Sequence, residues 1–154
     1  MKRGTRKLIP APGTPKSLHT FGAYNWRTSR VTYTLNRRKN SDSFIEFLEK
    51  LTTDYTDEAL ILVMDNASYH RSKAVQAALS LFEDQVYVFW LPKYSPFLNV
   101  IERFWLHFKH LAVANRLHHT LDDLAQTAHD VMANQNTNGH HNQLCFLDNF
   151  RSVA

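Results

Sequence analysis

Two short apolar runs, with a helical segment between them, constrain the fold of this chain most. The first run is Leu60–Met64, which ends at Asp65, and the second is Val86–Trp90. Apolar runs of this length, bounded by turn residues, are typical of strands that are buried on both faces. Apolar residues at helical spacing predict a helix over about residues 72–82. A strand, a helix and a second strand in this order favour parallel pairing, and therefore an α/β sheet.

The remaining segments extend this pattern on both sides. Residues 18–25 and 30–35 carry β-branched and aromatic side chains around the short segment 26–29, which predicts a hairpin. Ser41 is the expected cap of a helix whose apolar residues repeat at helical spacing from Phe44 to Leu51. Further helices are expected over about residues 99–113 and 121–134, the latter capped by Thr120, and residues 135–143 are expected to form a loop. The predicted order is β-β-α-β-α-β-α-α.

Composition limits the class of protein. The 154 residues suit one domain, and no apolar run is long enough to cross a membrane. The N-terminus is basic but no apolar signal core follows it, so a cytoplasmic protein is expected. The lone Cys145 excludes an internal disulfide. A net charge of +4 and a pI of about 9.3 permit nucleic-acid binding without requiring it. Residues 1–17 are predicted to form an extended basic segment.

Two acidic residues lie where chemistry is expected in an α/β fold. Asp65 ends a buried strand, and such strand ends collect the working groups of these sheets. The alternative is that Asp65 only caps the next helix. Glu102 lies near the start of the helix over 99–113, where the helix dipole favours an acid for purely structural reasons. Neither residue alone decides between a catalytic and a structural role.

The sequence around both acids is more specific. The stretch DNASYH follows the first apolar run, and LPKYSPFLNVIERFW follows the second. In this order the two stretches resemble motifs of bacterial insertion-sequence transposases of the mariner superfamily. The separation of Asp65 and Glu102 is 102 − 65 = 37 positions, close to that of the family. The resemblance implies that these residues are the second and third members of an acidic catalytic triad.

The resemblance also implies a fold and a reaction. It predicts a ribonuclease-H-like mixed sheet flanked by helices, with residues 18–154 forming the catalytic core. Two Mg²⁺ or Mn²⁺ ions between carboxylates would support DNA cleavage and strand transfer. In the family the first triad aspartate lies on a strand that precedes the segment seen here, and no aspartate before Asp65 matches it. We therefore expect an incomplete core, with its first strand missing or replaced.

Further residues are assigned through the resemblance. Asp65 and Glu102 are the expected catalytic and metal-binding residues, supported by Asn66 and His70; a polar His70 that merely lines the turn is the alternative. The candidates for DNA contact are Arg71, Lys73, Lys93, Arg103 and Lys109. The spacing of the histidines fits no standard zinc pattern. Trp90, Phe104, Trp105 and Phe108 are expected in the core rather than on a base-stacking surface.

The expected function is DNA transposition, with this chain as the C-terminal part of the catalytic core and with little nuclease activity by itself. The alternative is a non-catalytic remnant that binds DNA or pairs with full-length transposase. A different ribonuclease-H-like nuclease is disfavoured by the Tyr94-Ser95-Pro96 motif. A sheet without its central strand leaves unpaired backbone edges, so we also expect a homodimer in which a partner fills the gap.

Overall fold

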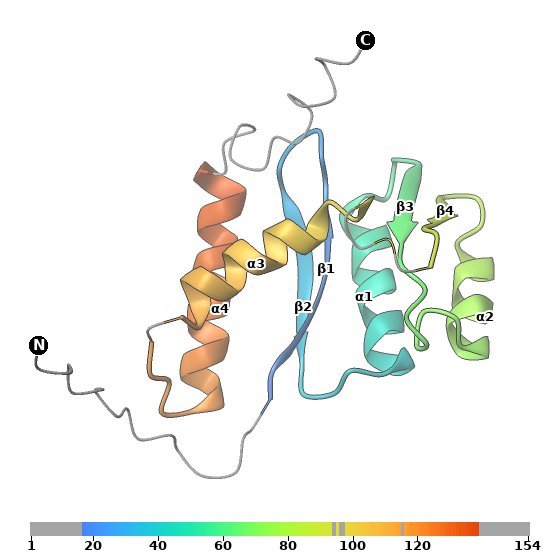
Figure 1. Ribbon diagram of the computed structural model, residues 1–154. Helices are drawn as coiled ribbons and strands as arrows, with labels where there is room; N and C mark the ends of the chain where they lie inside the picture. The colour runs from blue at the N-terminus through green and yellow to red at the C-terminus, as the bar shows by residue number, and fades with distance from the viewer. Residues whose placement is uncertain (1–16, 94, 96–97, 115, 139–154) are drawn as a thin grey trace, which may run out of the picture.

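The structure is a computed structural model, and it describes residues 17–93, 95, 98–114 and 116–138. Within these residues the order predicted from the sequence is confirmed (Figure 1). The elements are β1 (His19–Tyr24), β2 (Val31–Asn36), α1 (Ser41–Asp54), β3 (Leu60–Met64), α2 (Lys73–Leu81), β4 (Val86–Trp90), α3 (Ile101–Ala112) and α4 (Leu121–Asn138). The predicted segment over residues 1–17, apart from its last residue, lies outside the described residues, as do Cys145, Tyr94 and Pro96.

Polar side chains fix most of the element ends. The Asn25 side chain accepts hydrogen bonds from the amides of Arg27 and Thr28, which closes the predicted hairpin between β1 and β2. The predicted cap at Ser41 is wrong by one residue. Asn40 has the extended backbone of a cap and accepts a bond from the Ser43 amide, so Ser41 is the first residue of α1. Thr120 caps α4 as predicted, through the Asp123 amide.

The loop predicted from residue 135 onwards is also wrong, because α4 continues to Asn138. Two polar side chains there bind the hairpin between β1 and β2. Asn136 accepts from the Val31 amide at 2.7 Å and donates to the Val31 carbonyl at 3.0 Å, while Gln135 donates to Ser29. These tertiary bonds stabilise a helical turn whose local composition favours a loop.

The strands form two separate sheets in the described residues. One is the antiparallel pair of β1 and β2, and the other is the predicted parallel pair of β3 and β4. The prediction that β3 and β4 are buried on both faces is wrong. Burial alternates along both strands, and the apolar side chains of one face are exposed: Ile61, Val63, Tyr87 and Phe89. The apolar runs therefore predicted the positions of the two strands correctly, but not the burial of their faces.

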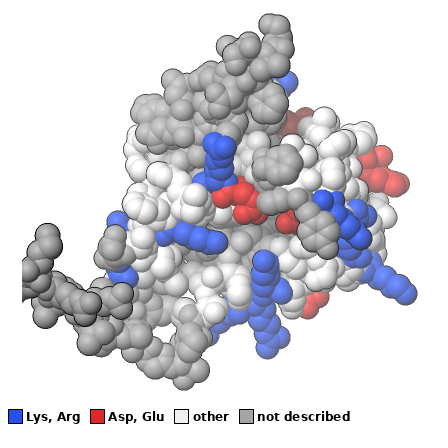
Figure 2. All heavy atoms as spheres, in the orientation of Figure 1, with Lys and Arg blue, Asp and Glu red and all other residues white. Residues whose placement is uncertain are grey.

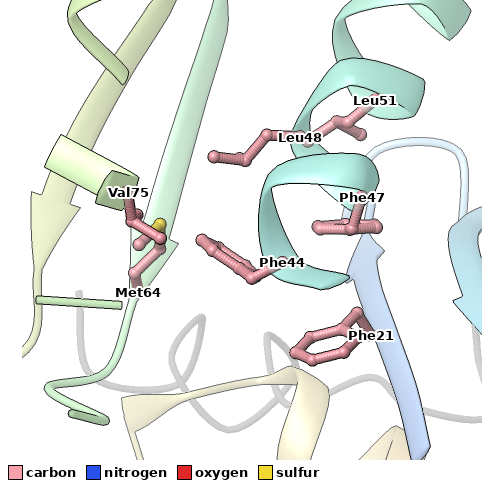
Figure 3. Packing of buried hydrophobic residues seen from close by; sticks show 7 residues of the cluster. All are labelled: Phe21, Phe44, Phe47, Leu48, Leu51, Met64 and Val75. Atoms are coloured by element: carbon pink, nitrogen blue, oxygen red, sulfur yellow. The ribbon is translucent and has the colours of Figure 1, made fainter. Parts of the chain in front are cut away.

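One hydrophobic cluster joins the two sheets. Figure 3 shows Phe21 of β1, Met64 of β3 and Val75 of α2 converging on the aromatic and leucine side chains of α1. Leu48 and Val75 are fully buried there. A second cluster packs α3 and α4 against β1 and β2, with Phe104 and Phe108 buried as predicted. Helix α1 therefore holds both sheets in place without any hydrogen bond between β1 and β3.

The close approach of α3 to β1 depends on a glycine. A Cβ atom at Gly22 would lie 2.8 Å from a ring carbon of Trp105, too close for any other residue without a shift of the ring. Trp105 and Trp90 are half-buried, so they are less enclosed than the phenylalanines of the core. Among the described helices, none is long and apolar enough to cross a membrane.

Candidate active site

Asp65 lies at the carboxyl end of β3, as the sequence predicts. Its Oδ1 atom accepts hydrogen bonds from the Ala67 amide at 3.1 Å and from the ring of His70 at 2.8 Å. Ser72, and not Asp65, caps the following helix α2, so the alternative that Asp65 only caps this helix does not hold. The side chain is 48% exposed, and no described residue donates to its Oδ2 atom. Asp65 therefore combines one fixed oxygen with one open to ligands.

His70 orients this carboxylate from a partly apolar niche. Its ring lies 4.3 Å from the rings of both Phe44 and Tyr69. Burial lowers the pKa of His70 below its usual value, and this outweighs the opposite effect of Asp65. The neutral ring donates its Nδ1–H to Asp65 and stays uncharged at neutral pH. Nearby Lys39 lowers the pKa further.

Glu102 is in the first turn of α3 and is exposed to solvent. It shares with Asp65 a cavity of about 410 Å³, which Asn66, Lys93 and Asn99 also line. Both acids also act on the Tyr69 hydroxyl. Burial first, and then the charges of both acids, raise the pKa of the Tyr69 hydroxyl to about 12. The structure thus brings the two predicted acids together at one site, from elements far apart in the sequence.

Asn66 ties the ends of β3 and β4 together. Its Nδ2 atom donates to the main-chain carbonyl of Leu91, directly after β4, and its Oδ1 atom accepts from the guanidinium of Arg71. That guanidinium in turn lies 3.7 Å from the centre of the Trp90 ring. We call Asn66, Arg71, Trp90 and Leu91 the strand-end clamp. It fixes the position of Asp65 relative to the loop that leads to Glu102.

The cavity suits a hard divalent cation. Carboxylate, amide and hydroxyl oxygens line it, and these are the ligand atoms that Mg²⁺ prefers while it keeps several of its waters. Within the described ranges, however, no three acidic, histidine or cysteine side chains lie close enough to hold a metal ion together. The site therefore offers two carboxylates, Asp65 and Glu102.

The basic candidates for DNA contact are all exposed, but they are placed differently. Lys93 lines the cavity of the two acids, Arg103 and Lys109 lie on α3, and Lys73 begins α2. Arg71 belongs to the strand-end clamp, so its guanidinium already has protein partners. Figure 2 shows acidic side chains near the middle of one face with Lys and Arg side chains around them. An acidic centre inside a basic surround suits a metal-assisted reaction on a polyanion.

Sequence reasoning missed Lys39 and Tyr69. The ammonium group of Lys39 lies 5.3 Å from the centre of the Tyr69 ring, so this lysine reaches the site from the loop before α1. The only signal for it in the sequence was a general excess of positive residues before residue 40. Tyr69 lies inside the DNASYH motif and could have been chosen from that position.

Comparisons with known proteins found two similarities. Residues 1–125 match the family model described as DDE superfamily endonuclease. The chain is also 31% identical over 104 residues to an uncharacterized 39 kDa protein of insertion element IS630 from Shigella sonnei. The match covers 67% of this chain but only 30% of that relative.

Proposed function

The chain belongs to the DDE superfamily endonucleases, and on this premise we propose that it carries two of the carboxylates of a metal-dependent site for DNA cleavage and strand transfer. The observation that carries the proposal is the shared cavity of Asp65 and Glu102 at the end of β3. The likeness to an insertion-element protein supports a role in transposition. Within the DDE endonucleases, we propose that the chain belongs to the mariner superfamily of transposases. We also propose that its fold is ribonuclease-H-like.

In this proposal Asp65 and Glu102 hold Mg²⁺ or Mn²⁺. The bound metal would supply charge neutralisation and an activated oxygen nucleophile for phosphodiester displacement. His70, neutral and held by aromatic rings, fixes Oδ1 of Asp65 and so leaves Oδ2 for the metal. Asn66 is a positioning residue that acts through the end of β4.

DNA and a second copy of the chain are the partners that we propose. Exposed cations around the acidic site support DNA, because they can neutralise phosphates on both sides of the reacting bond. Of these cations, Lys39, Lys93 and Lys109 line the two hollows that the acids also line. The four exposed apolar side chains on the outer face of β3 and β4 support self-association.

The alternative function is that of a non-catalytic transposase relative that binds DNA or pairs with a longer transposase. It is favoured by the observation that the described residues offer only two acids at the site. Both proposed functions predict DNA binding, so an experiment on metal binding and DNA cleavage is needed to distinguish them.

The test is a Mn²⁺ titration followed by NMR, with duplex nicking measured in the same samples. Paramagnetic Mn²⁺ should broaden the signals of His70 and Tyr69, and Asp65→Asn should abolish the effect. Asp57→Asn is the matched control, since Asp57 is exposed and lies before the opposite end of β3. Unchanged broadening in Asp65→Asn would refute the metal assignment. Metal binding without nicking, which we expect of the isolated chain, would favour the alternative over catalysis by this chain alone.

A further inference from the structure

The hairpin of β1 and β2 carries positive charges and no acidic residue. No aspartate or glutamate precedes Asp42 in the sequence, so nothing within the hairpin offsets its cations. Two exposed arginines lie at its tip, Arg27 and Arg30, and three exposed cations lie in the turn before α1, which are Arg37, Arg38 and Lys39. We call Arg37, Arg38 and Lys39 the basic turn. The tip and the basic turn lie at opposite ends of the hairpin (Figure 1).

The charges of the basic turn are not neutralised by ion pairs within the described part of the chain. The ion pairs found there join Lys50 to Asp54 and His70 to Asp65. Three neighbouring like charges repel one another, and this repulsion opposes folding until an anion binds them. A block of charge alone would still be only a solvated surface, so its position relative to the acids decides what it can do.

Lys39 reaches from the basic turn to the acidic site. Its ammonium group lies 5.3 Å from the centre of the Tyr69 ring, and both acids act on the hydroxyl of that ring. Burial is the main cause of the lowered pKa of His70, and the charge of Lys39 lowers this pKa further. Two side chains beside Asp65 are therefore within the electrostatic reach of Lys39.

Two hollows meet at the acids. Both the cavity of about 410 Å³ and a larger hollow of about 1090 Å³ are lined by Asp65, Asn99 and Glu102. Lys39 lines only the larger hollow, and Lys93 lines only the smaller one. A phosphate backbone that crosses the two acids would therefore have one lysine on each side of its reacting phosphate.

The contact with Tyr69 holds Lys39 without saturating it. A cation–π contact at an exposed site is weak, whereas a charge-assisted hydrogen bond to a phosphate oxygen is stronger. Lys39 is exposed, so its ammonium group can accept a new partner while the Tyr69 ring limits the directions in which it points. Lysine binds phosphate as a point charge and needs no fixed plane of hydrogen bonds, so a short movement from the ring is enough.

We propose that the basic turn binds the DNA backbone beside the acidic site, and that Lys39 leaves the Tyr69 ring to contact a phosphate next to the reacting one. Arg37 and Arg38 then contact neighbouring phosphates. The residues for DNA contact predicted from the sequence all follow Asp65, so the basic turn adds a second side to the DNA site. The choice of DNA rests on the proposed function, whereas the position of the turn rests on the contacts of Lys39.

DNA binding at several salt concentrations tests the basic turn. Arg38→Gln/Lys39→Gln removes two charges from the turn, and the matched control Arg27→Gln/Arg30→Gln removes two charges from the tip of the same hairpin. Fluorescence anisotropy gives the affinity for a labelled duplex, with Mg²⁺ and with a chelator. Each lost phosphate contact lowers the slope of log affinity against log salt by about 0.9, so the turn variant should lower it by about 2. Its affinity should fall at least about tenfold at low salt, and the tip variant should leave the slope unchanged.

The Tyr69 ring reports on Lys39 itself. In NMR spectra of protein with isotope-labelled tyrosine, the ring signals of Tyr69 should shift when the duplex is added, because the ammonium group leaves the ring. Lys39→Gln has no ammonium group, so this DNA-dependent shift should be lost. Lys39→Arg keeps a cation that can bind both the ring and a phosphate, and it should retain the shift. Tyr69→Phe assigns the signals.

Equal losses in the turn and tip variants would mean that only net charge matters, and would overturn the proposal. An unchanged slope in the turn variant would overturn it too, as would a Tyr69 shift that persists in Lys39→Gln. A glutamate peptide that competes with the duplex and depends equally on the turn would assign this surface to an acidic protein instead. Failure of the proposed function is seen separately, as a missing Mn²⁺ response at His70, which none of these binding measurements uses.

Discussion

Replacement of Asn66 by alanine should destabilise the protein through the main chain of β4. The substitution removes the donor to the Leu91 carbonyl and the acceptor for Arg71. Leu91 is buried, so its carbonyl cannot fully recover a partner from water. An unsatisfied group of this kind costs about 1–3 kcal/mol. We expect Asn66→Ala to lower the free energy of unfolding by about 2 kcal/mol.

The expected change is measurable by thermal and urea denaturation. For a domain of this size, 1 kcal/mol corresponds to about 2–4 °C in Tm, so Asn66→Ala should lower Tm by about 4–8 °C. Arg71→Ala is the matched control, because it removes the stacking on Trp90 and the bonds to Asn66 but leaves the bond to Leu91. Its cost should be about 1 kcal/mol, as for an exposed cation–π contact with a hydrogen bond.

The double variant completes the test of the clamp. If Asn66 and Arg71 act as one unit, the two costs should fall short of additivity by about 0.5–1 kcal/mol. Equal unfolding free energies of Asn66→Ala and the parent chain, within about 0.5 kcal/mol, would refute the reasoning. That result would mean that water or another group satisfies the Leu91 carbonyl. Strict additivity would show instead that the two side chains act independently.

Two further predictions concern groups whose pKa is shifted. Burial lowers the pKa of His70 below its usual value of 6.5 in the folded protein. As the pH falls, the unfolded chain therefore binds a proton at this residue before the folded protein does. The free energy of unfolding should consequently decrease from pH 6.5 down through the pKa of the folded state. In urea titrations across this range, His70→Asn, which keeps a donor for Asp65, should reduce that decrease, and an identical pH dependence would contradict the assignment. The Tyr69 hydroxyl should ionise near pH 12 in an ultraviolet titration, a late step absent from Tyr69→Phe. Its pKa should fall in Asp65→Asn and in Glu102→Gln, and an unchanged late step in both variants would show that neither acid acts on this ring.

The sequence predicted the kind and order of the elements well, because these depend on local patterns. The apolar runs at 60–64 and 86–90 specify strands wherever they lie. Which side chains cover a strand, however, is decided by tertiary packing. The run Leu60–Met64 would have the same sequence whether one face of the strand is exposed or both faces are covered. The extension of α4 likewise depends on bonds between Asn136 and Val31, which are 105 positions apart. No local pattern contains that information.

The site could be predicted in part for a similar reason. Asp65 and Glu102 were found through motifs, and their match to two members of an acidic triad predicted that they would meet. The roles of their neighbours depend on geometry that the motifs do not contain. Arg71 looked like a residue for DNA contact because it is positively charged, yet its guanidinium stacks on Trp90 and binds Asn66. Lys39 was not chosen at all, since only the packing of Tyr69 brings it near the site.

The position of the two acids therefore depends on side chains rather than on a continuous sheet. Between β1 and β3 there is no ladder in the described residues, so the core around Phe44 and the strand-end clamp carry the alignment. A metal ion that binds both acids should in turn stabilise this arrangement of side chains, because it binds the folded protein and not the unfolded chain.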